Sequence, residues 1–242
     1  MVYLFQVIFY QPVLNLLILL YNIIPGHDIG LAIIAMTIII KLILLPLSRQ
    51  SIKSQKALQD LQPKIDALKQ KYANNKEAMG RATIELYKQE KVNPFSSCLP
   101  LLIQLPFLWA VFQVFRDGLN GKALSLVYSF IGHPATVNHI SFGIVDLSKP
   151  NIVLAVLAGL AQFWQARMMS TKRPAIKVQA AKDEDMMAIM NKQMLYFMPA
   201  LTVFIGLTLP GGLALYWFVI TLLTALQQLY LFRKDNRLVK PV

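Results

Sequence analysis

The sequence predicts an all-α polytopic membrane protein with five transmembrane helices, an N-terminal interfacial amphipathic helix and a cytoplasmic helical hairpin. Composition is the first reason: of 242 residues, 56% are hydrophobic and 15% charged, against about 45–50% and about 25% in average domains. The second is that the apolar residues form long uncharged runs, and a spanning helix needs about 20 such residues. The third is a net charge of +12, whose placement along the chain predicts the topology.

The N-terminal segment 2–24 is uncharged and long enough to span a membrane. At about 100° per residue its polar side chains fall within about half of the helical circumference, which favours a helix lying in the membrane interface. They are Tyr3, Gln6, Tyr10, Gln11, Asn15, Tyr21 and Asn22. A sixth span is the alternative. A secretory signal is not predicted, because the segment lacks a basic start and a small-residue cleavage site.

Five apolar segments predict the spans. They cover residues 29–48, 95–115, 150–168, 193–209 and 213–232. The first contains a single charge, Lys41, and the second contains none. The last two arise from one uncharged stretch that Pro210-Gly211-Gly212 divides into two helices.

The basic residues predict the orientation. Lys and Arg are concentrated in segments 50–92 and 169–192 and in the tail 233–242, whereas the loop 116–149 carries only Arg116, Lys122 and Lys149. The positive-inside rule therefore places the first three segments in the cytoplasm and the loop 116–149 outside. The N-terminus is then expected outside and the C-terminus inside.

The segment 50–92 predicts an antiparallel helical hairpin. Apolar residues repeat at alternating spacings of three and four along its first part, which is typical of a packed helix: Leu58, Leu61, Ile65, Leu68 and Tyr72. A turn at 73–75 and a second helix over about 77–91 follow. Two interpretations stay open: a solvated loop held near anionic lipid by its lysines, or a docking arm for nascent chains, the ribosome or another partner.

Lys41 is the candidate functional charge. Burying a cation inside a span costs about 2.5–3.5 kcal/mol on insertion scales, so such a residue usually faces a polar cavity. The alternative is that its long side chain snorkels to the headgroups. No acidic residue lies inside any predicted span, so no ion-pair partner is predicted within the membrane.

Neutral polar residues in the spans provide the other candidate groups. They are Thr37, Gln104, Gln162, Gln165, Tyr216 and Trp217, with Thr224 further along the fifth span. If they converge with Lys41, they form a hydrated, positively charged groove that attracts an acidic peptide segment. Separately, the aromatic residues are also typical of an interface belt and the glutamines of hydrogen bonds between helices.

The sequence predicts no catalytic residue, no metal site and no cofactor. Its one cysteine, Cys98, excludes an internal disulfide framework. The three histidines have no metal-binding spacing, and phosphate-loop, dinucleotide and nucleophile-elbow motifs are missing from the sequence. Since most of the basic residues have a topological role, no specific nucleic-acid partner is expected.

Three stretches resemble the YidC/Oxa/Alb family of membrane protein insertases. They are NIIPGHDIGLAIIAMTIIIKLILLPLSRQSIKSQKALQDLQP at 22–63, VNPFSSCLPLLIQLPFLWAVF at 92–112 and LPGGLALYWFVITLLTALQQ at 209–228. The resemblance extends from about residue 3 to residue 234. The sequence resembles the short bacterial form of the family, which does not have the large additional domain of many Gram-negative members.

The resemblance implies a groove that is open to the cytoplasm and to lipid and closed toward the outside. It aligns Lys41 with a groove position at which the family usually has Arg, so the charge is kept and the planar donor fork is lost. Thr37, Gln165 and Trp217 match groove positions of relatives. Gln104 and Tyr216 are neighbours within the matching motifs.

By resemblance the expected function is a membrane protein insertase of the bacterial plasma membrane, which is not an enzyme. Its expected partners are nascent membrane proteins and the lipid bilayer, with the ribosome and the Sec translocon as further candidates. The alternative is a small anion transporter or channel that uses Lys41 as its binding charge. A membrane-embedded enzyme is the third class, and no set of catalytic residues supports it.

Overall fold

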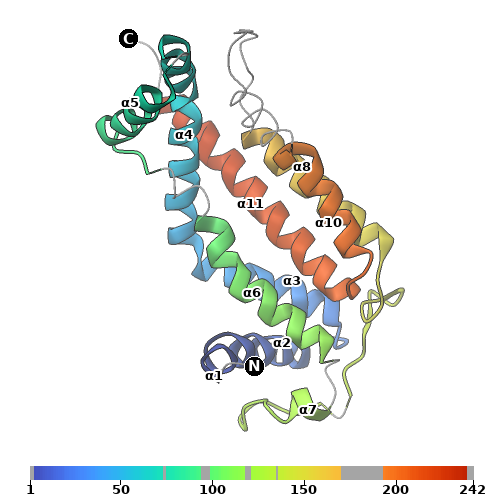
Figure 1. The fold of residues 1–242 in the computed structure, drawn as a ribbon. Coiled ribbons are helices and arrows are strands. Elements are labelled where there is room, and N and C mark those ends of the chain that lie inside the picture. The colour runs from blue at the N-terminus through green and yellow to red at the C-terminus, as the bar shows by residue number, and fades with distance from the viewer. Residues whose placement is uncertain are drawn as a thin grey trace.

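The computed structural model describes residues 3–72, 75–93, 99–117, 121–134, 136–169 and 193–238, and helices make up most of them (Figure 1). The elements are α1 (Tyr3–Phe5), a π-helical turn (Gln6–Tyr10), α2 (Gln11–Ile23), α3 (Ile29–Ile43), α4 (Leu45–Lys71), α5 (Lys76–Gln89), α6 (Leu99–Arg116), α7 (Gly121–Leu124), β1 (Ile140–Ser141), β2 (Val145–Asp146), α8 (Ile152–Met169), a second π-helical turn (Gln193–Phe197), α10 (Met198–Gly206) and α11 (Gly211–Leu238). The predicted all-α class is confirmed.

Several of these helices are long and apolar enough to cross a membrane. Among the described residues they are Tyr3–Ile23, Ile152–Met169 and Gly211–Arg233, with α3 and α4 together as a fourth candidate that is bent by 69°. Shorter apolar helices cover Leu102–Arg116 and Gln193–Gly206. The chain is therefore a multi-pass membrane protein. Each of the five predicted spans overlaps one of these apolar helices, and their exact bounds stay a prediction.

The bend between α3 and α4 begins before the predicted end of the first span. Helix α3 ends at Ile43, Leu44 caps it, and α4 begins at Leu45 with Pro46 in its first turn. Proline has no N–H to donate to the preceding helical turn, so the chain changes direction there rather than after residue 48. Helix α4 then runs without interruption into the hairpin.

The N-terminal helix lies across the end of the bundle, roughly perpendicular to α6 and α11 (Figure 1). Its polar side packs against the loop after α6 rather than facing only headgroups. The side-chain amide of Asn15 donates to the Leu126 carbonyl (3.2 Å), and its oxygen accepts from the N–H of Tyr128 (2.6 Å). Tyr21 and Asn22 make similar bonds to backbone groups of residues 138 and 132. The polar stripe therefore satisfies the backbone of a loop that has little regular structure.

Helices α4 and α5 form the predicted hairpin. The side chain of Asn75 caps α5 by accepting from the N–H of Ala78 (3.0 Å). Leu61 and Ile65, from the predicted apolar stripe, are buried. Residues 73–74 of the predicted turn lie outside the described part of the chain.

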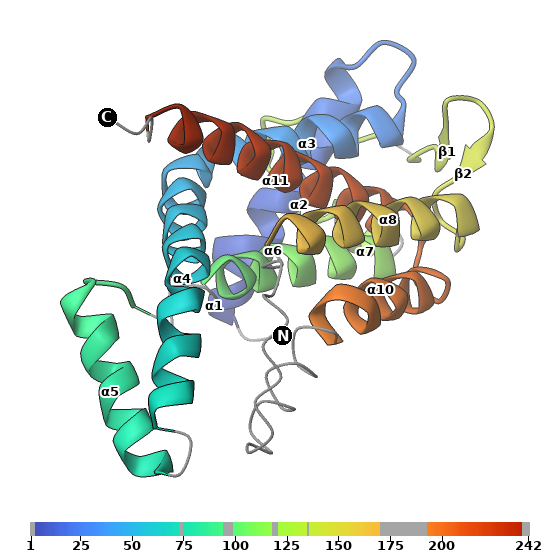
Figure 2. The ribbon, with the colours of Figure 1, turned by 90° about the horizontal axis from the view of Figure 1, so that it is seen from above.

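Helix α11 lies at the centre of the bundle, between α3 and the pair formed by α8 and α10 (Figures 1 and 2). Glycines allow α8 and α10 to approach closely. A Cβ added at Gly159 would lie 2.4 Å from the side chain of Val203, and one at Gly206 would lie 2.8 Å from the Cβ of Ala155. Small residues at a helix contact are the usual solution for packing within a membrane.

Candidate functional site

A polar cavity lies where α3, α4, α6, α8 and α11 meet. It encloses about 480 Å³, including its opening to solvent. Its lining residues are Lys41, Leu44, Ser48, Ile52, Gln55, Ile103, Gln104, Gln165, Thr224 and Gln228. Seven of these ten have polar side chains, which is unusual at a contact between apolar helices, so the cavity is the candidate site.

Lys41 is held in this cavity by neutral oxygen atoms. Its Nζ donates to the hydroxyl of Thr224 (2.7 Å) and to that of Ser48 (3.3 Å). The Thr224 hydroxyl donates in turn to the Ile220 carbonyl (2.7 Å), and the Ser48 hydroxyl donates to Oε1 of Gln227 (2.9 Å). In the described part of the chain no carboxylate forms a salt bridge with Lys41. The ammonium is therefore solvated by dipoles, and its charge is not neutralised within these residues.

Glutamines form a second part of the cavity lining. Nε2 of Gln104 donates to the hydroxyl of Tyr216, which is fully buried. Gln228 is almost fully buried, and its Oε1 accepts no hydrogen bond from the described residues. A buried acceptor without a donor usually has water or a ligand beside it.

The structure brings together part of the predicted groove set. Lys41, Gln104 and Gln165 line the cavity, and Tyr216 lies behind Gln104. The other predicted residues lie elsewhere.

Thr37 is fully buried and donates to the Ile33 carbonyl one turn earlier (2.6 Å). Gln162 accepts from the hydroxyl of Thr202 and so joins α8 to α10. Trp217 is half-buried and is not among the cavity-lining residues.

Sequence reasoning missed Ser48, Gln227 and Gln228. One signal was present for the glutamines: Thr221, Thr224 and Gln228 are spaced by three and four residues, so they share one face of a helix. Ser48 follows Lys41 by seven residues, which places both on one face of a continuous helix about two turns apart. The bend after Leu44 decides how closely they approach, and the sequence spacing by itself does not show that bend.

The end of the bundle beneath the N-terminal helix is filled with apolar side chains. On α3, α6 and α11 the buried core lies over residues 29–40, 110–115 and 213–220, whereas the cavity is lined by residues 41, 103–104 and 224–228 of the same helices. Helix α2 adds Leu14, Leu17 and Ile18 to the core. The three helices therefore share a closed apolar half and a half that contains the polar cavity.

Asp28 fastens the loop between α6 and α8 to this closed end. Its Oδ1 accepts from the N–H groups of Gly30 (2.8 Å) and Leu31 (3.0 Å) and from the Ser141 hydroxyl (2.6 Å), and its Oδ2 accepts from the N–H of Phe142. Partial burial works to raise the pKa of this carboxyl, but these hydrogen bonds outweigh it and hold the pKa below its ordinary value.

Comparison with known proteins gives consistent matches over most of the chain. Residues 19–237 match the family described as 60Kd inner membrane protein. The chain is 36% identical to the membrane protein insertase YidC of Fusobacterium nucleatum over 207 residues, which are 86% of this chain and 87% of that protein. It is 35% identical to YidC of Clostridium tetani over 193 residues, 80% of this chain and 76% of that one.

Some relatives are much longer. YidC of Geotalea daltonii is 35% identical over 209 residues, which are 85% of this chain but 34% of that protein. The matched region includes the helices that line the cavity and the loop that Asp28 holds. This chain belongs to the 60Kd inner membrane protein family, whose matched relatives are membrane protein insertases of the YidC type.

Proposed function

We propose that this protein is a membrane protein insertase that binds the hydrophilic tails of nascent membrane proteins in the cavity around Lys41 and releases their apolar segments into the bilayer. The observation that carries the proposal is an ammonium group solvated by Thr224 and Ser48 in an open polar cavity, without a carboxylate partner among the described residues. Membership of the insertase family supports the same function.

Attraction of negative charge is the first step of the proposed mechanism. Because neutral groups hold Lys41, an incoming carboxylate gains a charge-assisted hydrogen bond without displacing an existing ion pair. The cavity is surrounded by apolar helices, so the interaction is screened less than at a water-exposed surface. Gln228 offers an acceptor that a substrate backbone N–H could use.

Release of the substrate into lipid is the last step of the proposed mechanism. A polar tail in the cavity crosses less hydrocarbon than it would beside the protein, and the apolar segment of the substrate leaves sideways into the bilayer. Its transfer is favourable by about 0.8 kcal/mol for each buried CH₂ group. The protein provides a path and a binding charge, and no covalent bond changes.

The orientation follows from the charges and is part of the proposal. The cavity belongs to the half of the bundle from which α4 leads to the hairpin, and the basic helices α4 and α5 and the C-terminal end of α11 lie at the same end. That end is assigned to the cytoplasm, where substrates are made. The hairpin would receive them, and the ribosome and the Sec translocon are candidate partners at this surface. Segment 170–192, which carries further basic residues and methionines, lies outside the described residues.

Insertion into proteoliposomes tests the electrostatic step. The substrate is a single-span protein with an acidic tail, and the variants are Lys41→Arg, Lys41→Ala and Lys41→Glu. We expect Lys41→Arg to keep most of the activity. Lys41→Glu should reduce insertion roughly tenfold or more, because repulsion of about 1.4 kcal/mol already corresponds to a factor of ten. A substrate with a neutral tail should be affected much less.

Lys53→Glu is the matched control, because Lys53 is an exposed cation on α4 outside the cavity lining. If it impairs insertion as strongly as Lys41→Glu, general surface charge explains the result and the groove proposal fails. Equal insertion of the acidic substrate by wild type and Lys41→Glu would also contradict it.

Deletion of residues 57–91, which leaves the cavity-lining residue Gln55 in place, distinguishes an insertase from an anion transporter. An insertase should lose activity, since the hairpin receives the substrate. A transporter that needs only Lys41 should retain anion flux into sealed vesicles without any hairpin.

A further inference from the structure

The turn between β1 and β2 exposes apolar side chains that no other part of the described chain covers. Ile144 is 85% exposed, Phe142 57% and Ile140 48%. The same loop buries Val137 and Leu147 in the core. Its remaining apolar side chains therefore project outward from a structure whose interior is already filled.

Hydrogen bonds fix the backbone conformation of this turn. Phe142 has a φ of 52° and Gly143 a φ of 72°, so an aromatic residue occupies the left-handed region that side chains with a Cβ rarely adopt. The bond from the Phe142 N–H to Asp28 and the bond from the Ile144 N–H to the Ser141 carbonyl (3.1 Å) fix that conformation. The strained turn presents Phe142 and Ile144 at its tip.

The turn lies level with the ends of three apolar helices. Asp28, which holds Phe142, directly precedes α3. The carbonyls of Leu147 and Lys149 accept from the first two N–H groups of α11 (3.0 and 2.9 Å), and α8 begins shortly afterwards at Ile152. Viewed along the bundle, β1 and β2 lie at its periphery, beyond α3 and α8 (Figure 2). The ends of membrane-spanning helices lie where hydrocarbon gives way to headgroups, so this is the environment expected for side chains that project from the turn.

Charged residues are missing from the sequence around the turn, as expected for a segment that contacts lipid. Residues 123–145 contain no Lys, Arg, Asp or Glu, and charged residues return at Asp146 and Lys149, at the base of the turn. The first residues of α8, Ile152 and Val153, are also largely exposed, so the apolar helix that follows the turn begins with exposed apolar side chains as well. Exposing these apolar side chains to bulk water is unfavourable, whereas burying them at the boundary between headgroups and acyl chains is favourable.

We propose that the β1–β2 turn is a second interfacial anchor, which inserts Phe142 and Ile144 into the leaflet at the end of the bundle where the N-terminal helix lies. The occupant of this surface is lipid. The anchor would hold the loop that closes the bundle at a set depth, on the far side of the molecule from the hairpin. It depends on the membrane location of the chain and not on the proposed insertase activity.

Quenching of a site-specific fluorophore tests the anchor. In a Cys98→Ser background, bimane is attached to Ile144→Cys in the full chain, reconstituted in vesicles of phosphatidylethanolamine and phosphatidylglycerol. Leu160→Cys, on the exposed side of α8, is the lipid reference, and Glu77→Cys, exposed on α5, is the water reference. We expect nitroxide on the acyl chains to quench position 144 nearly as strongly as position 160, and aqueous iodide to quench it severalfold less than position 77.

Two outcomes would overturn the proposal. Quenching of position 144 by iodide to the level of position 77, without quenching by lipid, would place the turn in water. Protection from both quenchers would mean that a protein surface, from a second copy or another partner, covers it.

A second variant tests whether the two apolar side chains are the cause. The fluorophore is attached at Ile140→Cys, and Phe142→Gly with Ile144→Ser are added. Glycine removes the strain at φ 52°, so the fold should be kept, which an unchanged thermal unfolding midpoint checks. We expect lipid quenching at position 140 to fall severalfold, and full retention would contradict the anchor.

Discussion

At the scale of single residues, two charged side chains differ in how fully hydrogen bonds within the fold satisfy them. Among the described residues, Lys41 is held by the neutral oxygens of Thr224 and Ser48 and forms no salt bridge, so its charge stays available. Asp28 accepts four hydrogen bonds, two of them from the first turn of α3 and two from the β1–β2 region. Its charge is therefore stabilised by groups of the fold itself. The first arrangement suits binding, and the second suits a permanent connection between helix and loop.

Asp28→Asn should lower the free energy of unfolding by about 1.5–3 kcal/mol, the usual contribution of a hydrogen bond to a charged group. Its amide nitrogen would face the Phe142 N–H, so two donors would meet. Chemical unfolding of the purified protein in detergent measures this change. Asp60→Asn, at an exposed position of α4, is the control and should cost less.

The same residue predicts part of the acid sensitivity. The folded-state pKa of Asp28 lies below its ordinary value, so its contribution is complete above that value and is lost as the pH falls through the folded-state pKa. The stability difference between wild type and Asp28→Asn should therefore be constant near neutral pH and shrink under acid conditions. A difference that grows as the pH falls would contradict this assignment.

At the scale of elements, close packing and bends decide how the helices meet. Gly159 and Gly206 bring α8 and α10 together, and Gly212 lies against the ring of Phe115, where an added Cβ would come within 2.3 Å. Pro46 directs α4 away from α3 and so brings Ser48 toward Lys41. The cavity therefore depends on small residues and a proline that carry no functional group of their own.

Gly159→Ala should destabilise the protein by about 1–3 kcal/mol, since the added Cβ would overlap Val203 in a packed contact. Gly80→Ala is the matched control, because an added Cβ at Gly80 on α5 meets nothing within 4 Å. There the change should stabilise by about 0.4–1 kcal/mol. Thermal unfolding in detergent distinguishes the two, and equal shifts of the same sign would refute the packing argument.

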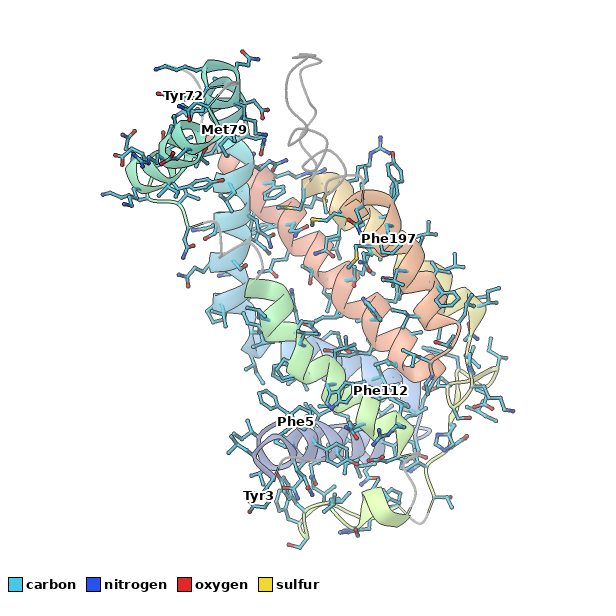
Figure 3. The ribbon with its side chains drawn as sticks, in the orientation of Figure 1. Tyr3, Phe5, Tyr72, Met79, Phe112 and Phe197 are labelled. Atoms are coloured by element: carbon cyan, nitrogen blue, oxygen red, sulfur yellow. The ribbon has the colours of Figure 1, made fainter. Side chains whose placement is uncertain are left out.

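At the scale of the whole molecule, the two ends of the bundle are chemically different. Tyr72 and Met79 lie at the far end of the hairpin, while Tyr3 and Phe5 lie at the opposite end with the loop that Asp28 holds (Figure 3). The polar cavity opens in the half nearer the hairpin, and the half beneath the N-terminal helix is apolar and closed. If the proposed function holds, such an arrangement gives a substrate access from one side of the membrane only.

Cysteine accessibility tests the proposed orientation. In a Cys98→Ser background, a membrane-impermeant maleimide added to intact spheroplasts should label Lys149→Cys within the loop and leave Glu77→Cys on the hairpin unlabelled. Both side chains are largely exposed, so access to the reagent depends on the side of the membrane. After lysis both should react, and the reverse pattern in intact cells would invert the topology.

The sequence by itself determined the class, the apolar segments and the isolation of Lys41. These features depend on composition and on local periodicity, which the amino-acid sequence shows directly. It also identified Gln104 and Gln165, since polar residues inside apolar runs are conspicuous.

Only the tertiary structure decided which polar residues share a space. Thr37 and Gln162 make bonds within or between helices, whereas Ser48 and Gln228, which no motif marks, line the cavity. The size of the bend at Leu44, which Pro46 allows, and the rotation of each helix set that difference, and both depend on packing between segments far apart in the chain. For the same reason the polar stripe of the N-terminal helix was visible in the sequence, while its partner, the backbone of the loop before β1, was not.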